Sequence, residues 1–148
     1  MNLEIYNMTI SDLFLISDKL SENFDSFWTE GILKSELENP NSRYIVAKQD
    51  NEIVGFAGIW ISVDDVHITN IVTRKDKRNQ GIGSLLLEKL INLAKETKLA
   101  SLTLEVNENN SSAIHLYEKF GFSKLGIRKK YYNNKDNAII MTMNFNID

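Results

Sequence analysis

The stretch Arg78-Asn79-Gln80-Gly81-Ile82-Gly83-Ser84 joins a strand-like run to a long helical pattern. Its two glycines let the main chain approach a ligand closely, and the helix that follows presents unpaired N–H groups and the positive end of its dipole. These features predict an anion site, most naturally for a diphosphate. The stretch lacks the Gly-Lys-Ser/Thr ending of a P-loop, and Leu86 stands at the last glycine position of the dinucleotide motif G-x-G-x-x-G. Taken alone, the stretch is explained equally well as an ordinary turn that starts a helix.

The segments around this stretch alternate between strand and helix patterns. After Gly83, apolar residues recur at helical spacing through about residue 97. Residues suited to capping a helix stand before three further helical patterns, at Thr9, Thr29 and Asn110. Strands are predicted at residues 3–8, 44–47, 53–61, 66–72, 102–107, 122–128 and 138–145.

The resulting order, β-α-α-β-β-β-α-β-α-β-β, predicts an α/β fold: a mixed sheet with helices on its faces. The strand–helix–strand unit around residues 66–107 should be a right-handed parallel crossover. In the first helix, the apolar set Leu13, Phe14, Ile16 and Leu20 is expected to face the core. Residues 49–52 are predicted to form a hairpin turn between two strands.

Composition restricts the class of protein. The 148 residues predict a single domain over residues 1–148, and the 43% hydrophobic and 25% charged fractions exclude general disorder. The absence of Cys excludes disulfides, cysteine zinc sites and a thiol nucleophile. No long apolar run or signal-peptide pattern is present, so a cytoplasmic protein without membrane contact is expected. A net charge of −3 argues against direct binding of nucleic acid.

A few polar side chains are candidates for chemistry. Glu105 interrupts an apolar strand, where it could act as a general base, although a solvated glutamate is the simpler interpretation. Tyr117 by itself is best explained as a half-buried helix aromatic. His67 and His115 are too few and too far apart to indicate a metal site, and a packing or surface role is the better interpretation of both. The basic run at residues 128–130 precedes two tyrosines, but the acidic chain disfavours nucleic-acid stacking there.

Several spaced motifs stand along the chain: Phe27-Trp28-Thr29, Asn70-Ile71-Val72, Arg78-x-x-Gly81-x-Gly83, Leu104-Glu105-Val106-x-x-x-Asn110-x-x-Ala113-x-x-Leu116-Tyr117-x-x-x-Gly121-Phe122, Arg128-x-x-Tyr131-Tyr132 and Ala138-Ile139-Ile140-Met141. Together they resemble the GNAT acetyltransferase superfamily and, within it, the ribosomal-protein-alanine N-acetyltransferase (RimI-like) family. The resemblance spans nearly the whole chain.

This resemblance implies a function and a set of roles. The chain is expected to transfer acetyl from acetyl-CoA, with no metal, directly to the N-terminal α-amine of a protein, with a ribosomal protein that begins with Ala as the expected acceptor. Glu105 would be the general base and Tyr117 the general acid. The implied cofactor-binding residues are Ile71, Val72, Thr73, Arg78, Asn79, Gln80, Gly81, Ile82, Gly83, Ser84 and Asn110; the implied lining of the peptide groove is Trp28, Tyr131 and Tyr132.

Three departures from the family pattern accompany the resemblance. The stretch before the glycines is Thr73-Arg74-Lys75-Asp76, without the usual proline, and Asn107 and Asn137 replace a basic and an acidic residue expected near the acceptor groove. Two alternatives therefore stay open: an acetyltransferase for a small amine such as a polyamine or antibiotic, and a non-catalytic acyl-CoA sensor that binds a partner protein. The sequence does not predict an oligomeric state.

Overall fold

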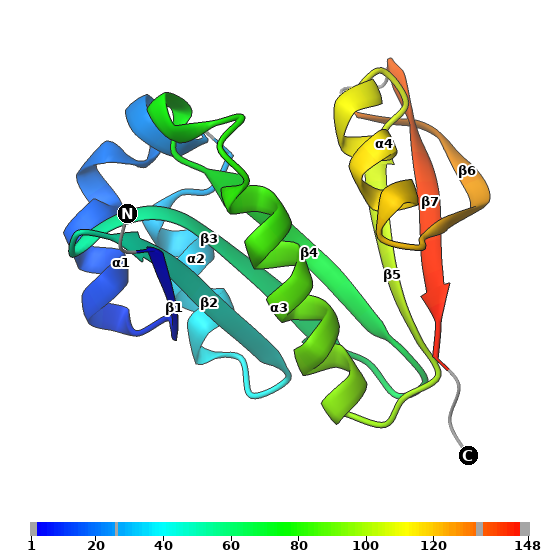
Figure 1. The fold of residues 1–148 in the computed structure, drawn as a ribbon, viewed down its shortest axis with the longest axis horizontal. Coiled ribbons are helices and arrows are strands. Elements are labelled where there is room, and N and C mark those ends of the chain that lie inside the picture. The colour runs from blue at the N-terminus through cyan, green and yellow to red at the C-terminus, as the bar shows by residue number, and fades with distance from the viewer. Residues whose placement is uncertain (1–2, 26, 133–134, 146–148) are drawn as a thin grey trace.

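The computed structural model describes residues 3–25, 27–132 and 135–145. The predicted order of elements is confirmed, and one seven-stranded mixed sheet runs in the order β1-β2-β3-β4-β5-β7-β6 (Figure 1). The elements are β1 (Leu3–Asn7), α1 (Ile10–Ile16), α2 (Glu30–Glu38), β2 (Ser42–Gln49), β3 (Glu52–Ile61), β4 (Val66–Thr73), α3 (Ile82–Glu96), β5 (Ser101–Asn107), α4 (Ser111–Lys119), β6 (Ser123–Tyr132) and β7 (Asp136–Asn144).

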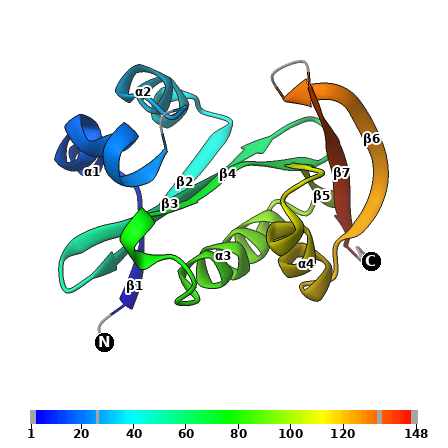
Figure 2. The same cartoon turned by 90° about the horizontal axis from the view of Figure 1, so that it is seen from above.

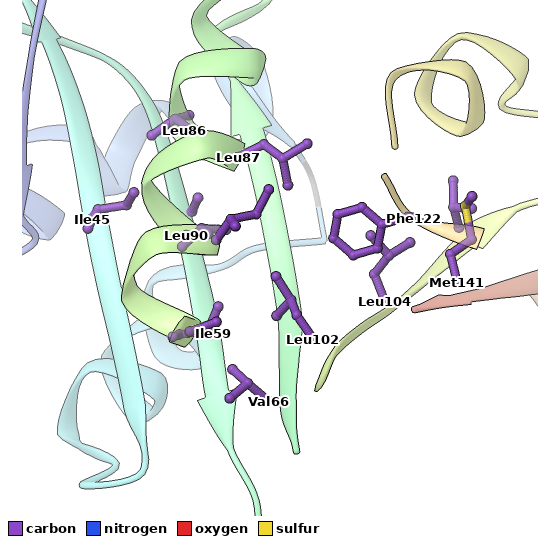
Figure 3. Close-up of a cluster of buried hydrophobic side chains, with 14 of the residues drawn as sticks. Ile45, Ile59, Val66, Leu86, Leu87, Leu90, Leu102, Leu104, Phe122 and Met141 are labelled. Atoms are coloured by element: carbon purple, nitrogen blue, oxygen red, sulfur yellow. The ribbon is translucent and has the colours of Figure 1, made fainter. Parts of the chain in front are cut away.

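The helices divide between the two faces of the sheet. Helices α1 and α2 lie on one face, and α3 and α4 lie on the other (Figure 2). The larger core cluster includes Leu86 and Leu90 of α3 together with Leu104, Phe122 and Met141, so it joins both halves of the sheet on the α3/α4 face (Figure 3). A smaller cluster around Phe24, Tyr44 and Phe56 fills the α1/α2 face.

Strands β4 and β5 are the feature of the sheet that positions the site. They are the parallel pair expected on either side of α3, and they pair only at Val66 with Leu102 and at His67 with Thr103. All other neighbouring strands pair in antiparallel fashion over longer registers. Beyond His67, therefore, the two strands separate in the middle of the sheet.

A bulge in β4 changes which side chains face this separation. Gly58 pairs with Asn70, but the next residue, Ile59, pairs with Ile68, so Thr69 is an extra residue in β4. A bulge of this kind interrupts the alternation of side chains. The Thr69 hydroxyl lies 3.0 Å from the Tyr44 hydroxyl on the α1/α2 face, and the Asn70 amide lies near the same Tyr44. The bulge thus places two consecutive polar side chains on one face.

The local signals for helix starts and turns are confirmed. The Thr9 N–H donates to Asp12 Oδ2 (2.8 Å) and the Asp12 N–H donates to Thr9 Oγ1 (3.2 Å), which completes the capping box. Thr29 and Asn110 cap α2 and α4. The hairpin between β2 and β3 turns through Asp50 and Asn51, whose φ angles of 52° and 71° are left-handed.

The first helix is shorter than expected. Helix α1 ends at Ile16 and continues as a 3-10 turn (Ser17–Lys19) and a π turn (Leu20–Phe24). Leu13 and Ile16 are buried as expected, but Phe14 is 55% exposed. Leu13 and Ile16 lie about 60° apart around the helix, whereas Phe14 lies about 160° from Ile16 and so points away from the core.

The close approach of Tyr44 to β3 allows a test of the packing beneath the bulge. A Cβ added at Gly58 would lie 2.3 to 2.6 Å from three atoms of the Tyr44 ring, which is buried and held through its hydroxyl. We expect Gly58→Ala to lower the free energy of unfolding by about 1–3 kcal/mol, the usual range for overpacking, as measured by urea denaturation. The control is Gly31→Ala in α2, where a Cβ meets nothing within 4 Å and should raise stability. Equal stability of the two variants would contradict the tight packing at Tyr44.

Candidate active site

A cavity of about 890 Å³ lies where β4 and β5 separate. Its wall on the α1/α2 side comes from Trp28 and Glu36, and its floor comes from β4 residues 67–72 and from Glu105. Ile71 and Leu104, which belong with the core cluster of the opposite face, also line it. The cavity therefore reaches into the gap between the two strands.

Glu105 lies on β5 with its side chain in this cavity, on the face opposite Leu104. Its side chain is 32% exposed, and its carboxylate forms an ion pair with Arg128 of β6, whose Nη1 lies 3.3 Å from Oε2 and 3.4 Å from Oε1. The guanidinium also lies over the Tyr131 ring, 4.6 Å from its centroid. The sequence drew attention to Arg128 only as part of a motif and a basic run, and its partnership with Glu105 is a finding of the structure.

Tyr117 lies on the other side of the sheet. It is part of α4, packs against the larger core cluster, and makes an edge contact with Phe122 at a centroid distance of 5.8 Å. Burial raises the pKa of its hydroxyl, so the group stays protonated over a wide range of pH. Tyr117 is absent from the cavity lining among the described residues. The structure thus positions the expected base and the expected acid on opposite faces of the sheet.

The glycine stretch forms the start of α3 with an open, uncapped end. Gly81 has a left-handed φ of 85° and precedes a helix without a side-chain cap, and Asn79 is also left-handed at 63°. A Cβ at Gly83 would approach only the Thr73 hydroxyl, at 3.8 Å. The helix N–H groups therefore remain available, and this main-chain cradle fits a diphosphate.

The remaining residues of the stretch have different surroundings. Gln80 is exposed, whereas Ile82 is buried in the core and Ser84 is partly buried in the first turn of α3. The Arg78 guanidinium donates to the carbonyls of Thr73 (3.4 Å) and Phe24 (3.3 Å), which ties the loop to the end of β4 and to the segment before α2.

The other site residues predicted from the sequence lie partly in the cavity and partly at the start of α4. Trp28 and Tyr131 line the cavity together with Ile71 and Val72. Asn110 Oδ1 accepts from the Ala113 N–H at 3.2 Å as the cap of α4. The side chain of Tyr132 lies outside the described part of the structure.

The two asparagines at the family departures make local contacts. Asn107 Nδ2 donates to Asp136 Oδ2 (3.2 Å), and the Asn137 N–H donates to Glu108 Oε2 (2.7 Å). These bonds tie the end of β5 to the start of β7, and neither asparagine is among the described residues that line the cavity. Their effect on acceptor choice stays a prediction.

Asn70 lines the cavity with a buried side-chain amide. It is 8% exposed, and among the described residues neither atom of its amide has a hydrogen-bond partner of good geometry. An unpaired buried amide costs about 1–3 kcal/mol. The bulge at Thr69, which turns Asn70 toward Tyr44, could not be read from the sequence pattern.

No group of His, Asp or Glu in the described ranges is arranged to hold a metal ion. Among the helices described, none combines the length and apolar character needed to cross a membrane.

The strand separation, the cavity and the uncapped glycine turn together define an acyltransferase of the GNAT type. Residues 6–122 match the acetyltransferase (GNAT) family, and the chain belongs to this family. It is an acetyl-CoA-dependent N-acetyltransferase, as expected from the sequence motifs.

Particular relatives narrow the resemblance to the RimI-like group. A Bacillus subtilis (strain 168) protein, provisionally named a ribosomal protein bS18-alanine N-acetyltransferase, is 38% identical over 144 residues, 96% of this chain and 95% of its own length. The crystal structure of the ribosomal-protein-S18-alanine N-acetyltransferase from Escherichia coli matches with a TM-score of 0.85 and 27% identity, and the match covers 99% of this chain and 96% of that one. A GNAT acetyltransferase from Elizabethkingia anophelis with acetyl-CoA bound matches with a TM-score of 0.74 and 25% identity over 97% of this chain and 99% of its own.

Proposed function

We propose that the protein acetylates the N-terminal α-amine of a ribosomal protein that begins with Ala, by direct transfer from acetyl-CoA. The observation that carries this proposal is the cavity at the separation of β4 and β5, which has Glu105 in its floor and reaches between the strands. The names of the relatives from Bacillus subtilis and Escherichia coli supply the acceptor class. An acceptor of this kind implies a cytoplasmic protein.

In this proposal acetyl-CoA approaches from the start of α3. Its diphosphate binds the N–H groups of residues 79–84, and its acetyl arm follows β4 at Ile71, Val72 and Thr73. The open space at Gly83 and the left-handed turn at Gly81 support this placement. A main-chain N–H near Val72 then polarises the thioester carbonyl.

The acceptor enters from the α1/α2 side of the sheet. Trp28 and Tyr131 offer apolar surface to the first residues of a peptide, and the carboxylates of Asp25, Glu36 and Glu105 favour a cationic amine. Glu105 takes a proton from the attacking nitrogen, and Tyr117, kept protonated by burial, gives a proton to the leaving thiolate across the gap between the strands.

The chemistry of the amine favours an α-amino terminus over a lysine side chain. Reference pKa values are about 7.7–8.0 for an α-amine and about 10.4 for lysine. At pH 7 roughly a tenth of the α-amine is neutral, against about 0.04% of the lysine, a difference near 3 kcal/mol. A carboxylate such as Glu105 can deprotonate the α-amine more readily, because less free energy is needed than for lysine.

The test uses a peptide that carries both a free N-terminal Ala and an internal Lys. After incubation with acetyl-CoA, fragment mass spectrometry should locate the acetyl group on the α-amine. The matched control is the same peptide with a blocked N-terminus, which should release no thiol. Acetyl on Lys with the α-amine left free would overturn the proposal and favour a lysine or small-amine acceptor.

A further inference from the structure

The proposed reaction removes two protons from the acceptor nitrogen, and Glu105 is one acceptor for them. An α-ammonium carries three N–H bonds and the product amide carries one, so two protons must leave the nitrogen. One proton ends on the thiol of coenzyme A and the other is released to solvent. Most α-amine is protonated at pH 7, so the first proton must leave before attack and the second as the amide forms. A single carboxylate must otherwise accept both in turn.

A second group suited to accept a proton lies in the same cavity. The His67 ring of β4 lines the cavity, and its Nε2 lies 3.0 Å from Asp65 Oδ1 in the turn before β4. A carboxylate can only accept, so Nε2 carries the hydrogen and the lone pair of a neutral ring lies on Nδ1. The Trp60 ring packs beside the imidazole, with 5.9 Å between the two ring centroids. The ring is therefore held in one orientation from two sides.

The strand register places His67 and Glu105 on the same face of the sheet, in the lining of one cavity. His67 pairs with Thr103 at the last parallel pair before the strands separate. Glu105 follows two residues later on β5, on the same face as Thr103 because side chains alternate along a strand, and both His67 and Glu105 line the cavity. The His67 side chain is 40% exposed, which leaves it a path to exchange protons with solvent.

We propose that His67, oriented by Asp65, is a second proton acceptor of the acceptor cavity, one that takes the first proton from the incoming α-ammonium. The N–H bond of the ammonium breaks, its electron pair stays on nitrogen, and the proton moves to His67 Nδ1 and then to solvent. Glu105 takes the second proton as the N–C bond forms and the C–S bond breaks, and the thiolate leaves with a proton from Tyr117. The proton on Glu105 then passes to solvent while Tyr117 regains one, so that a single proton is released overall. This inference rests on the proposed function.

The charges around the ring suit this task. Asp65 binds it directly, Glu105 of β5 and Glu36 of α2 line the same cavity, and Asp25 lies in the segment before α2. Tyr131 of β6 also lines the cavity, and the Arg128 guanidinium on the same strand is paired with Glu105.

The experiment compares kcat/KM of wild type and His67→Gln for an N-terminal Ala peptide between pH 6.5 and 9.5. We expect the variant to lose about tenfold or more at pH 7, within the range for loss of a proton-transfer group, and to approach wild type above pH 9, where the α-amine is neutral unaided. His115→Gln, at the exposed second histidine of the chain, should match wild type at every pH. Imidazole added to His67→Ala should restore part of the rate.

Several outcomes separate the interpretations. A loss in His67→Gln that is equal at all pH values, or a loss below twofold at pH 7, would overturn the role of His67 while wild-type turnover keeps the proposed function intact. No acetylation of the α-amine by wild type would instead overturn the proposed function. Should His67→Gln not fold, as judged by its melting temperature, Asp65→Asn replaces it, and we expect the same pH-dependent loss at smaller size. The absence of that loss would likewise overturn the role.

Discussion

Replacing Glu105 by Gln should lower turnover by roughly 10²–10⁴-fold, the usual effect of losing a general base, while acetyl-CoA binding is retained. The substitution keeps the size of the side chain and removes its ability to accept a full proton. The pair with Arg128 is largely exposed, so its loss should change stability by no more than about 1 kcal/mol. Steady-state thiol release with an N-terminal Ala peptide measures the rate, and calorimetry measures the affinity for acetyl-CoA.

The control for this substitution is Glu88→Gln, which removes an equal charge from an exposed position of α3. It should leave turnover unchanged. If Glu105→Gln loses less than about threefold at pH 7, proton transfer to this carboxylate is not needed and the assignment of the base is wrong.

Placing Asp at Gly83 should weaken acetyl-CoA binding at least tenfold, about 1.4 kcal/mol. The new carboxylate would stand in the first turn of α3, where the diphosphate is expected, and two unit charges about 5 Å apart repel by about 3 kcal/mol at an effective dielectric constant near 20. The same carboxylate favours the positive end of the helix dipole, so the melting temperature should hold or rise. Binding and stability are thus expected to change in opposite directions.

The matched control is Gly83→Asn, which adds a side chain of the same shape without the charge. A Cβ at Gly83 has room in the structure, so both variants should fold. Any difference between the two variants in acetyl-CoA affinity, measured by titration calorimetry, should therefore come from the charge. Equal affinities for acetyl-CoA would mean that the phosphates bind elsewhere.

The order of elements could be predicted because its signals are local. The caps at Thr9, Thr29 and Asn110 and the helical spacing after Gly83 depend on residues a few positions apart, and each was confirmed. Likewise the family could be predicted, because its motifs fix residue types at set spacings over residues 6–122.

The features that shape the candidate site depend on distant residues. Arg128 and Glu105 are 23 positions apart in the sequence, so no local pattern predicts the ion pair between them. The bulge at Thr69 is set by the pairing of β4 with β3, so continuous alternation in β4 predicted neither the position of Asn70 nor its contact with Tyr44. The early end of α1 depends on residues 17–24, which form a 3-10 turn and a π turn and so bury Leu20 and Phe24.

The short pairing of β4 with β5 has a mechanical consequence. Strands β1–β4 and β5–β7 form two hydrogen-bonded blocks that are joined by two residue pairs, at Val66 and His67. On the α3/α4 face the larger core cluster crosses this junction, whereas on the α1/α2 face the cavity lies over it. The blocks should therefore rotate about a hinge at Val66, with the cavity side widening and the core side remaining packed. We therefore expect the width of the acceptor side to vary more than the packing around α3, the helix at whose start the coenzyme is expected to bind.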